Sequence, residues 1–171
     1  MPTNSVQLYV KSLLDGITMP GVTKQMAAFV TPPTVMNINA PVACVWGARL
    51  HGRRQTAPRI GNATLAGASG YHEFNWIVDV YLSYETVARN NTNGDTLDQE
   101  FPLVIDGVLN TLMVTEMPKV IQDPSTGQYS QILSIGEEFE MDYPPEKTPA
   151  TLRMLYYTTR LGLIIKEAIQ L

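Results

Sequence analysis

The chain has 171 residues, of which 44% are hydrophobic and 16% charged, and its formal net charge is -4. This composition is ordinary for a folded protein and excludes wholesale disorder. The length predicts one domain, residues 1–171, that can bury a core without disulfides, and the single cysteine cannot form one within the chain. No run approaches the roughly 18 apolar residues of a membrane helix, and the start lacks a signal-peptide pattern, so we expect a soluble, unexported protein.

The first periodic stretch predicts a short amphipathic helix from Val6 to Leu14. Ser5 precedes it as a capping residue, and Gly16 follows where a helix favours a left-handed terminator. Prolines are frequent in the next segment, 17–41, and they prevent a long regular element there. We expect an extended connector with one short strand near Ala27 to Val30, which wraps the domain or a neighbouring molecule.

Two strands joined by a long hairpin come next. The run from Val42 to Leu50 is short and rich in strand formers, and the run from Tyr71 to Glu85 alternates between apolar and other residues. That alternation predicts one buried face, made of Phe74, Trp76, Val78, Val80, Leu82 and Tyr84. The segment between the strands, 52–70, is dominated by small residues, and a loop of this length in a compact domain is usually functional or mobile.

A second amphipathic helix is predicted from Leu97 to Leu112, after a polar break at 88–94. Pro102 leaves two starts open, one at Asp95 or Thr96 with capping-box spacing and one at the proline itself. In either case the apolar stripe of the helix must pack on the sheet.

Two more strands, from Gln128 to Glu140 and from Met154 to Lys166, are separated by a rigid link with three prolines. The inward residues expected in the last strand are Leu155, Tyr157, Leu161, Leu163 and Ile165. Together the elements predict an α+β domain, in which a mixed or antiparallel four-stranded sheet is covered by the second helix and carries a long hairpin loop.

Charge is unevenly distributed along the chain. Four arginines and no acid lie between residues 49 and 59, whereas residues 85 to 146 hold twelve acids against two basic residues. The four are Arg49, Arg53, Arg54 and Arg59. This separation favours contact between opposite ends of two copies, although the arginines can equally stand singly on a solvated hairpin. A nucleic-acid groove is disfavoured, because the arginines lack interleaved aromatic residues and the net charge is negative.

The candidate chemical sites are few. His51 and His72 lie at the two bases of the hairpin and could meet across it, but two histidines without a third ligand make a poor zinc site, so we predict no metal. Cys44 has no neighbouring base in the sequence and is predicted to belong to the core. Phosphate-binding, nucleophile-elbow and CxxC motifs are absent, so we expect neither an enzyme nor a cofactor. An enzyme would need a pocket that joins the two histidines to an acid.

An acidic run lies in the predicted strand near residue 140. It consists of Glu137, Glu138, Glu140 and Asp142. The run lacks the ligand spacing of a calcium loop, and a cluster of this kind favours a solvated strand end or an interface over a pair of catalytic carboxylates.

The order of helix, hairpin strands, helix and closing strands is similar to that of the tail terminator and tail completion proteins of long-tailed bacteriophages. The elements that carry the resemblance span 6–14, 42–50, 71–85, 97–112, 128–140 and 154–166, and segment 17–41 and the arginine loop depart from it. The resemblance implies a structural protein of the virion neck, assembled in the host cytoplasm, with no membrane or sequence-specific nucleic acid as partner. Such a protein forms a hexameric ring that caps the tail tube, stops its polymerisation and meets the head-side connector or stopper protein.

A ring of this kind requires that one surface patch meets a different patch on the next copy. We hypothesise that the arginines contact the tube protein or the adjacent subunit and that part of the acidic run complements them. The residues of this candidate interface are Arg49, Arg53, Arg54, Arg59, Glu137, Glu138 and Glu140. Two other interpretations stay open. One is a different neck component, such as a head completion or stopper protein, and the other is an unrelated cellular ligand-binding module, which would need a pocket.

Overall fold

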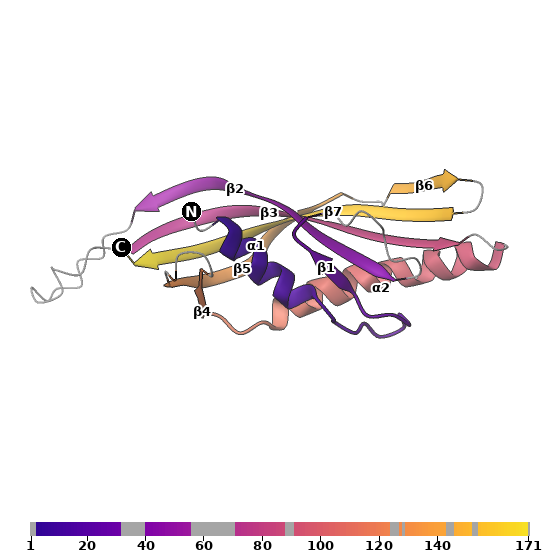
Figure 1. The fold of residues 1–171 in the computed structure, drawn as a ribbon, viewed down its shortest axis with the longest axis horizontal. Coiled ribbons are helices and arrows are strands. Elements are labelled where there is room, and N and C mark those ends of the chain that lie inside the picture. The colour runs from indigo at the N-terminus through magenta and orange to yellow at the C-terminus, as the bar shows by residue number, and fades with distance from the viewer. Residues whose placement is uncertain are drawn as a thin grey trace, which may run out of the picture.

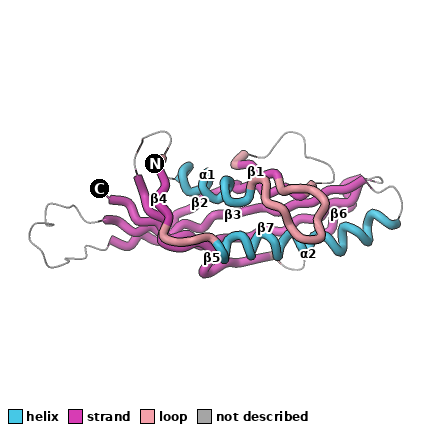
Figure 2. The backbone as a smooth tube through the Cα atoms, turned by 90° about the horizontal axis from the view of Figure 1, so that it is seen from below, coloured by secondary structure: helices cyan, strands magenta, loops and turns pink. Residues whose placement is uncertain are grey.

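The structure, a computed structural model, describes residues 3–31, 40–55, 71–87, 91–123, 127, 129–142, 146–151 and 154–170. Within these residues the chain forms one sheet of seven strands, and both helices lie against the same face of it (Figures 1 and 2). The elements are α1 Thr3–Leu14, β1 Ala27–Phe29, β2 Pro41–Gln55, β3 Tyr71–Val87, α2 Asn91–Val114, β4 Lys119–Gln122, β5 Tyr129–Met141, β6 Glu146–Thr151 and β7 Met154–Gln170.

The strands follow the order β1-β2-β3-β7-β5-β4, and β6 pairs with the first part of β7. β1 and β2 run parallel and every other pair described is antiparallel, so the sheet is mixed and the α+β class is confirmed. Three short strands enlarge the sheet beyond the four long ones expected. Of these, β1 falls where a short strand was predicted, whereas β4 and β6 were missed. Prolines explain both misses, because Pro118 directly precedes β4 and Pro149 lies inside β6.

β3 and β7 form the centre of the sheet. Each has 17 residues, and they pair without a register shift from Tyr71 opposite Gln170 to Val87 opposite Met154. At about 3.3 Å per residue this ladder is about 55 Å long, several times the length of a typical strand. The long dimension of the molecule in Figure 1 follows this ladder.

The hydrophobic core lies between the helices and one face of the central strands. The predicted inward residues of β3 from Trp76 to Tyr84 are all buried, and so are Leu161, Leu163 and Ile165 of β7. Phe74 is partly buried and stacks on Trp76, with ring centroids 6.1 Å apart. The helices contribute Val6, Val10, Leu14, Phe101, Val104, Val108 and Leu112. The side chains of residues 155 and 157, also predicted to face inward, lie outside the described part.

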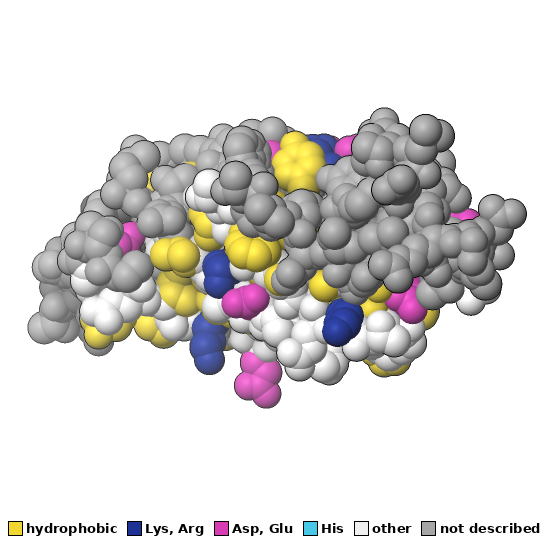
Figure 3. Space-filling view, turned by 45° about the vertical axis from the view of Figure 1, so that its right-hand side comes forward, with side chains coloured by type: hydrophobic (Ala, Val, Ile, Leu, Met, Phe, Trp, Pro, Cys, Tyr) yellow, Lys and Arg dark blue, Asp and Glu magenta, His cyan; other side chains and the backbone are white. Residues whose placement is uncertain are grey.

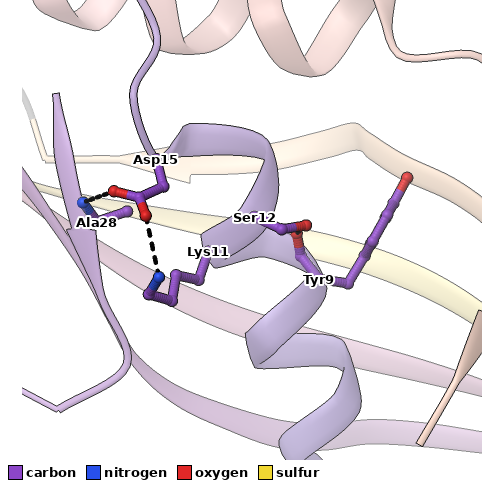
Figure 4. Close-up of polar contacts among 5 residues, drawn as sticks. All are labelled: Tyr9, Lys11, Ser12, Asp15 and Ala28. Atoms are coloured by element: carbon purple, nitrogen blue, oxygen red, sulfur yellow. Dashed lines mark hydrogen bonds and ion pairs between the residues drawn. The ribbon is translucent and has the colours of Figure 1, made fainter. Parts of the chain in front are cut away.

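A short polar network closes the sheet edge at β1 (Figure 4). Asp15, just after α1, accepts a hydrogen bond from the backbone N–H of Ala28 at 3.0 Å and pairs with Lys11 at 3.1 Å. The hydrogen bond from Ala28 is the main reason that the pKa of Asp15 is lowered, and Lys11 adds to it. Gly16 has a φ of 76°, the left-handed conformation predicted for a helix terminator, and its N–H donates to the carbonyl of Met26 at 2.8 Å.

α2 begins at Asn91, before either predicted start. Residues 91–94 of the polar run that was interpreted as a break are helical, and Pro102 is accommodated inside the helix at an exposed position. Tyr84 of β3 donates a hydrogen bond to Glu100 at 2.7 Å, which ties α2 to the sheet. Two turns further along the same helix, Gly107 packs against Met19, and a Cβ at this position would overlap the Met19 side chain.

Replacement Gly107→Ala should therefore lower the free energy of unfolding. Alanine raises helix propensity by up to about 1 kcal/mol, but overpacking a close contact costs about 1–3 kcal/mol, so we expect a net loss of about 1–2 kcal/mol in urea unfolding. Asn110→Ala, at an exposed position one turn along α2, is the matched control and should be neutral or stabilising. A Gly107→Ala protein at least as stable as the unmodified chain would contradict the close packing.

Candidate functional site

The arginines of the candidate interface lie mostly on a strand and not in a loop. β2 continues to Gln55, so the segment predicted to begin the loop at residue 52 is still paired with β3. Arg49 stands opposite Ile77, Arg53 opposite Phe74 and Arg54 opposite Glu73. The structure describes the backbone of these three arginines but not their side chains, and Arg59 lies outside the described residues.

The acids lie on β5, in and beside a bulge. Ile135 stands opposite Ile165 and Phe139 opposite Leu163, so residues 136–138 of β5 face the single residue 164 of β7. Gly136 has a φ of 69°, a conformation that a bulge of this kind needs and that other residues adopt at a cost. Glu137 and Glu138 follow it within the bulge, and Glu140 is exposed opposite Gly162.

The sheet order places the two sets of charges on opposite sides of the central pair. β2 neighbours β3, and β5 neighbours β7, so three strand spacings, or about 14 Å, separate them. β1 pairs with β2 only at residues 42–44, and β4 pairs with β5 only at residues 129–132. In the described part of the chain, the rest of β2 and β5 has no strand on its outer side. In a single copy, the strand positions of Arg49, Arg53 and Arg54 therefore lie across the central pair from those of the acids.

The two ends of β2 differ in how their outer side is satisfied. Near β1, the carbonyl of Val45 in β2 accepts a hydrogen bond from Gln7 of α1 at 3.3 Å. There β1 covers β2, and the N–H of Ala28 in β1 donates in turn to Asp15. Farther along, the strand carries charged residues and two register shifts, between Val45 and Gly47 and between Leu50 and Gly52. Charges and bulges on an outer strand prevent uncontrolled pairing with other sheets. Protection of this sheet edge against pairing is therefore the alternative to a binding role for the arginines.

An ion pair that sequence analysis did not identify occupies the outer face of the central strands. Arg160 of β7 contacts Asp79 of β3 through Nε at 3.0 Å and Nη2 at 2.8 Å, and the two side chains are 22% and 12% exposed. Hydrogen bonding to Asp79 is the main reason that the pKa of Arg160 is raised. Gly162 lies beside the pair, and a Cβ there would make an ordinary van der Waals contact, 3.4 Å from Arg160 Nη2. Oppositely charged side chains lie next to one another on the face drawn in Figure 3.

A second unpredicted polar group is buried on the inner face. Glu167 of β7 is fully buried, and its Oε2 accepts a hydrogen bond from Trp76 Nε1 at 2.8 Å. Burial is the main cause that raises the pKa of Glu167. The signal was present in the sequence, because Glu167 continues the inward period of Leu161, Leu163 and Ile165. The predicted strand ended at Lys166, one residue before Glu167.

The remaining candidates lie apart from one another. His51 falls at the register shift near Trp76 and Asn75, whereas His72 stands opposite Gln55, so the two histidines are not opposite each other. Cys44 is half-buried and lies outside the core cluster, which corrects the prediction of a core cysteine. Burial raises the pKa of its thiol. The described residues contain no group of three possible metal-ligating side chains.

No family model matches the chain, and no curated protein is significantly similar to it. Neither of the two described helices has both the length and the apolar character needed to cross a membrane.

The half-buried ion pair should matter more than the exposed one. Asp79→Ala leaves the Arg160 guanidinium without its partner, and we expect a loss of about 2 kcal/mol in the free energy of unfolding. Lys11→Ala removes an exposed pair with Asp15 and should cost no more than about 0.5 kcal/mol. A double variant, Asp79→Ala with Arg160→Ala, should cost less than the sum of the single changes. Equal effects of Asp79→Ala and Lys11→Ala would contradict this ranking.

Proposed function

We propose that this chain is a structural protein of a bacteriophage virion, a tail terminator that forms a hexameric ring, caps the tail tube and stops its polymerisation. The ring joins the tube to the head-side connector or stopper protein, and it assembles in the host cytoplasm without enzymatic activity or cofactor. One observation carries the proposal. The arginines and the acids occupy strands on opposite sides of the β3–β7 pair.

This placement supports head-to-tail contact between copies. A ring is built from a heterologous interface, in which one patch meets a different patch on the next copy. Within a copy, β3 and β7 separate β2 from β5, so the strand positions of the two charged sets favour a contact between copies. Complementary charges on unlike surfaces favour this pairing over contact of like surfaces, and they accelerate encounter.

The strand register distinguishes the arginines from one another. Arg54 stands opposite Glu73, which gives it an acidic cross-strand neighbour within its own copy. Arg49 and Arg53 stand opposite Ile77 and Phe74, so their cross-strand neighbours supply no acid. We therefore assign the contact between copies chiefly to Arg49 and Arg53. The bulges in β2 and β5 support contact through side chains rather than by extension of the sheet.

Exposed apolar side chains supply a surface for a further partner. Met113 and Val114 end α2, and Val120 and Tyr129 lie on the β4–β5 hairpin that follows. All four are at least 60% exposed. Apolar groups that stay exposed near one another in the chain are consistent with a surface that another protein covers. The tube protein and the head-side connector are the proposed partners.

Reversing the charge of Arg49 and Arg53 should abolish ring formation. The variant Arg49→Glu/Arg53→Glu should remain folded and monomeric in light scattering at concentrations where the unmodified chain is a hexamer. We expect at least about a tenfold higher concentration for assembly for each close ion pair lost. Arg54→Glu is the matched control and should weaken assembly less. Adding Glu137→Arg and Glu138→Arg to the double variant should restore rings, and failure of this charge swap would count against the pairing.

Electron microscopy with tube protein tests the function beyond ring formation. Rings that cap tubes and fix their length are the expected result, and the monomeric double variant should leave tube length uncontrolled. A protein that forms rings but binds only portal-side components would instead be a head completion or stopper protein. A stable monomer that ignores tubes would sink the terminator proposal and favour an unrelated binding module.

A further inference from the structure

Glu167 is buried where four strands meet, and its surroundings offer little to stabilise a negative charge. It stands opposite Phe74 of β3 on one side and Ile132 of β5 on the other, and the next strand, β4, places Lys119 in the same row. The side chain of Glu167 has no exposed surface. An ionised carboxylate in such a position loses its hydration and needs a cation or several donors to replace it.

The described neighbours of the carboxyl group are neutral or acidic. Trp76 donates one hydrogen bond to Oε2 at 2.8 Å, and the Ser130 hydroxyl also favours the ionised form. Oε1 has no hydrogen-bond partner among the residues that the structure describes. Asp123, buried at the end of β4, acts against ionisation by its own charge.

Among the side chains that the structure describes, no cation of the neighbouring strands compensates for this. Lys119 lies two strands away in the row and is exposed, and Lys166, the residue before Glu167, is exposed too. Neither is bonded to the Glu167 carboxyl group in any contact described. Burial and the acidic neighbour oppose ionisation and the donors Ser130 and Trp76 favour it, and burial, the largest of these effects, raises the pKa of Glu167.

We propose that Glu167 holds its proton in the folded protein to a higher pH than an exposed glutamate does, and that release of this proton to solvent loosens the sheet where β3, β7, β5 and β4 meet. The protonated acid still accepts the hydrogen bond of Trp76 through one oxygen, and its other oxygen carries the proton as an O–H group. Loss of the proton leaves a buried charge whose hydration requires water to enter between these strands. Protonation of Glu167 does not depend on ring formation, so it can be tested whatever the oligomeric state.

The direction of the pH dependence follows from proton binding. Because the pKa of Glu167 is raised by folding, the folded chain holds a proton over a pH range in which the unfolded chain has lost it. The resulting stabilisation is fully present below the ordinary glutamate pKa of about 4.3. It is lost as the pH rises through the raised value. The isosteric variant Glu167→Gln stays neutral and escapes this loss.

Urea unfolding of the unmodified chain and of Glu167→Gln, from about pH 4 to about pH 9, tests the proposal. The midpoint of Glu167→Gln should exceed that of the unmodified chain by about 0.5 M or more at the alkaline end, and the difference should vanish toward pH 4. Glu116→Gln, at an exposed position just after α2, is the matched control and should show no such divergence. A Glu167→Gln protein that is less stable at alkaline pH would overturn the proposal, because it would show that the ionised carboxylate is stabilised in the fold.

The indole N–H of Trp76 provides a second readout that needs no variant at position 167. Its NMR signal, distinguished from that of Trp46 by a Trp76→Phe or Trp46→Phe protein, should shift and exchange faster with solvent as Glu167 ionises. The change should occur in the pH range where the two unfolding curves diverge. An indole signal that keeps its shift and its exchange protection across that range would refute the loosening of the sheet.

Discussion

The ladder between β3 and β7 sets the position of every other part of this fold. It pairs 17 residues of each strand without a shift, and all the longer strands attach to it directly, β2 beside β3 and β5 beside β7. Because side chains alternate between faces along a strand, this register determines which residues meet the helices and which meet solvent. The core against α1 and α2, the ion pair on the outer face and the buried glutamate all depend on it.

The local sequence pattern was sufficient to predict the elements in which apolar residues recur with a short period. The alternation from Phe74 to Tyr84 identified the buried face of β3, and the helical spacing from Val6 to Leu14 identified α1, because each has one buried side. The start of α2 and the strands β4 and β6 were missed, since polar runs and prolines are local signals that tertiary packing overrode here. The local pattern could not predict the order of the strands in the sheet either.

The candidate interface shows the same division between local and long-range information. The sequence alone revealed that arginines and acids are segregated along the chain and which residues carry these charges. Their location on opposite sides of the central pair depends on strand order, which joins residues 67 to 99 positions apart, from Val87 opposite Met154 to Tyr71 opposite Gln170. The extension of β2 to Gln55, which moved Arg53 and Arg54 from a loop to a strand, likewise depends on pairing with β3. Glu167 was predictable by period alone, but the absence of a cation among its described neighbours was not.

Two polar contacts fix the register of the central ladder in a way that hydrophobic alternation cannot. A slip by two residues keeps every apolar side chain on its own face, so burial alone hardly opposes it. Asp79 stands opposite Gly162 and bonds to Arg160, two residues before it, whereas Trp76 stands opposite Ile165 and bonds to Glu167, two residues after it. The two diagonal contacts run in opposite senses. A slip that brings Asp79 directly opposite Arg160 moves Trp76 four residues, or about 13 Å, away from the position opposite Glu167. The reverse slip brings Trp76 opposite Glu167 and moves Asp79 four residues away from the position opposite Arg160. Every two-residue slip therefore breaks one of the contacts and leaves a poorly solvated charge or donor without its partner, which is why polar residues inside this long apolar ladder specify its alignment.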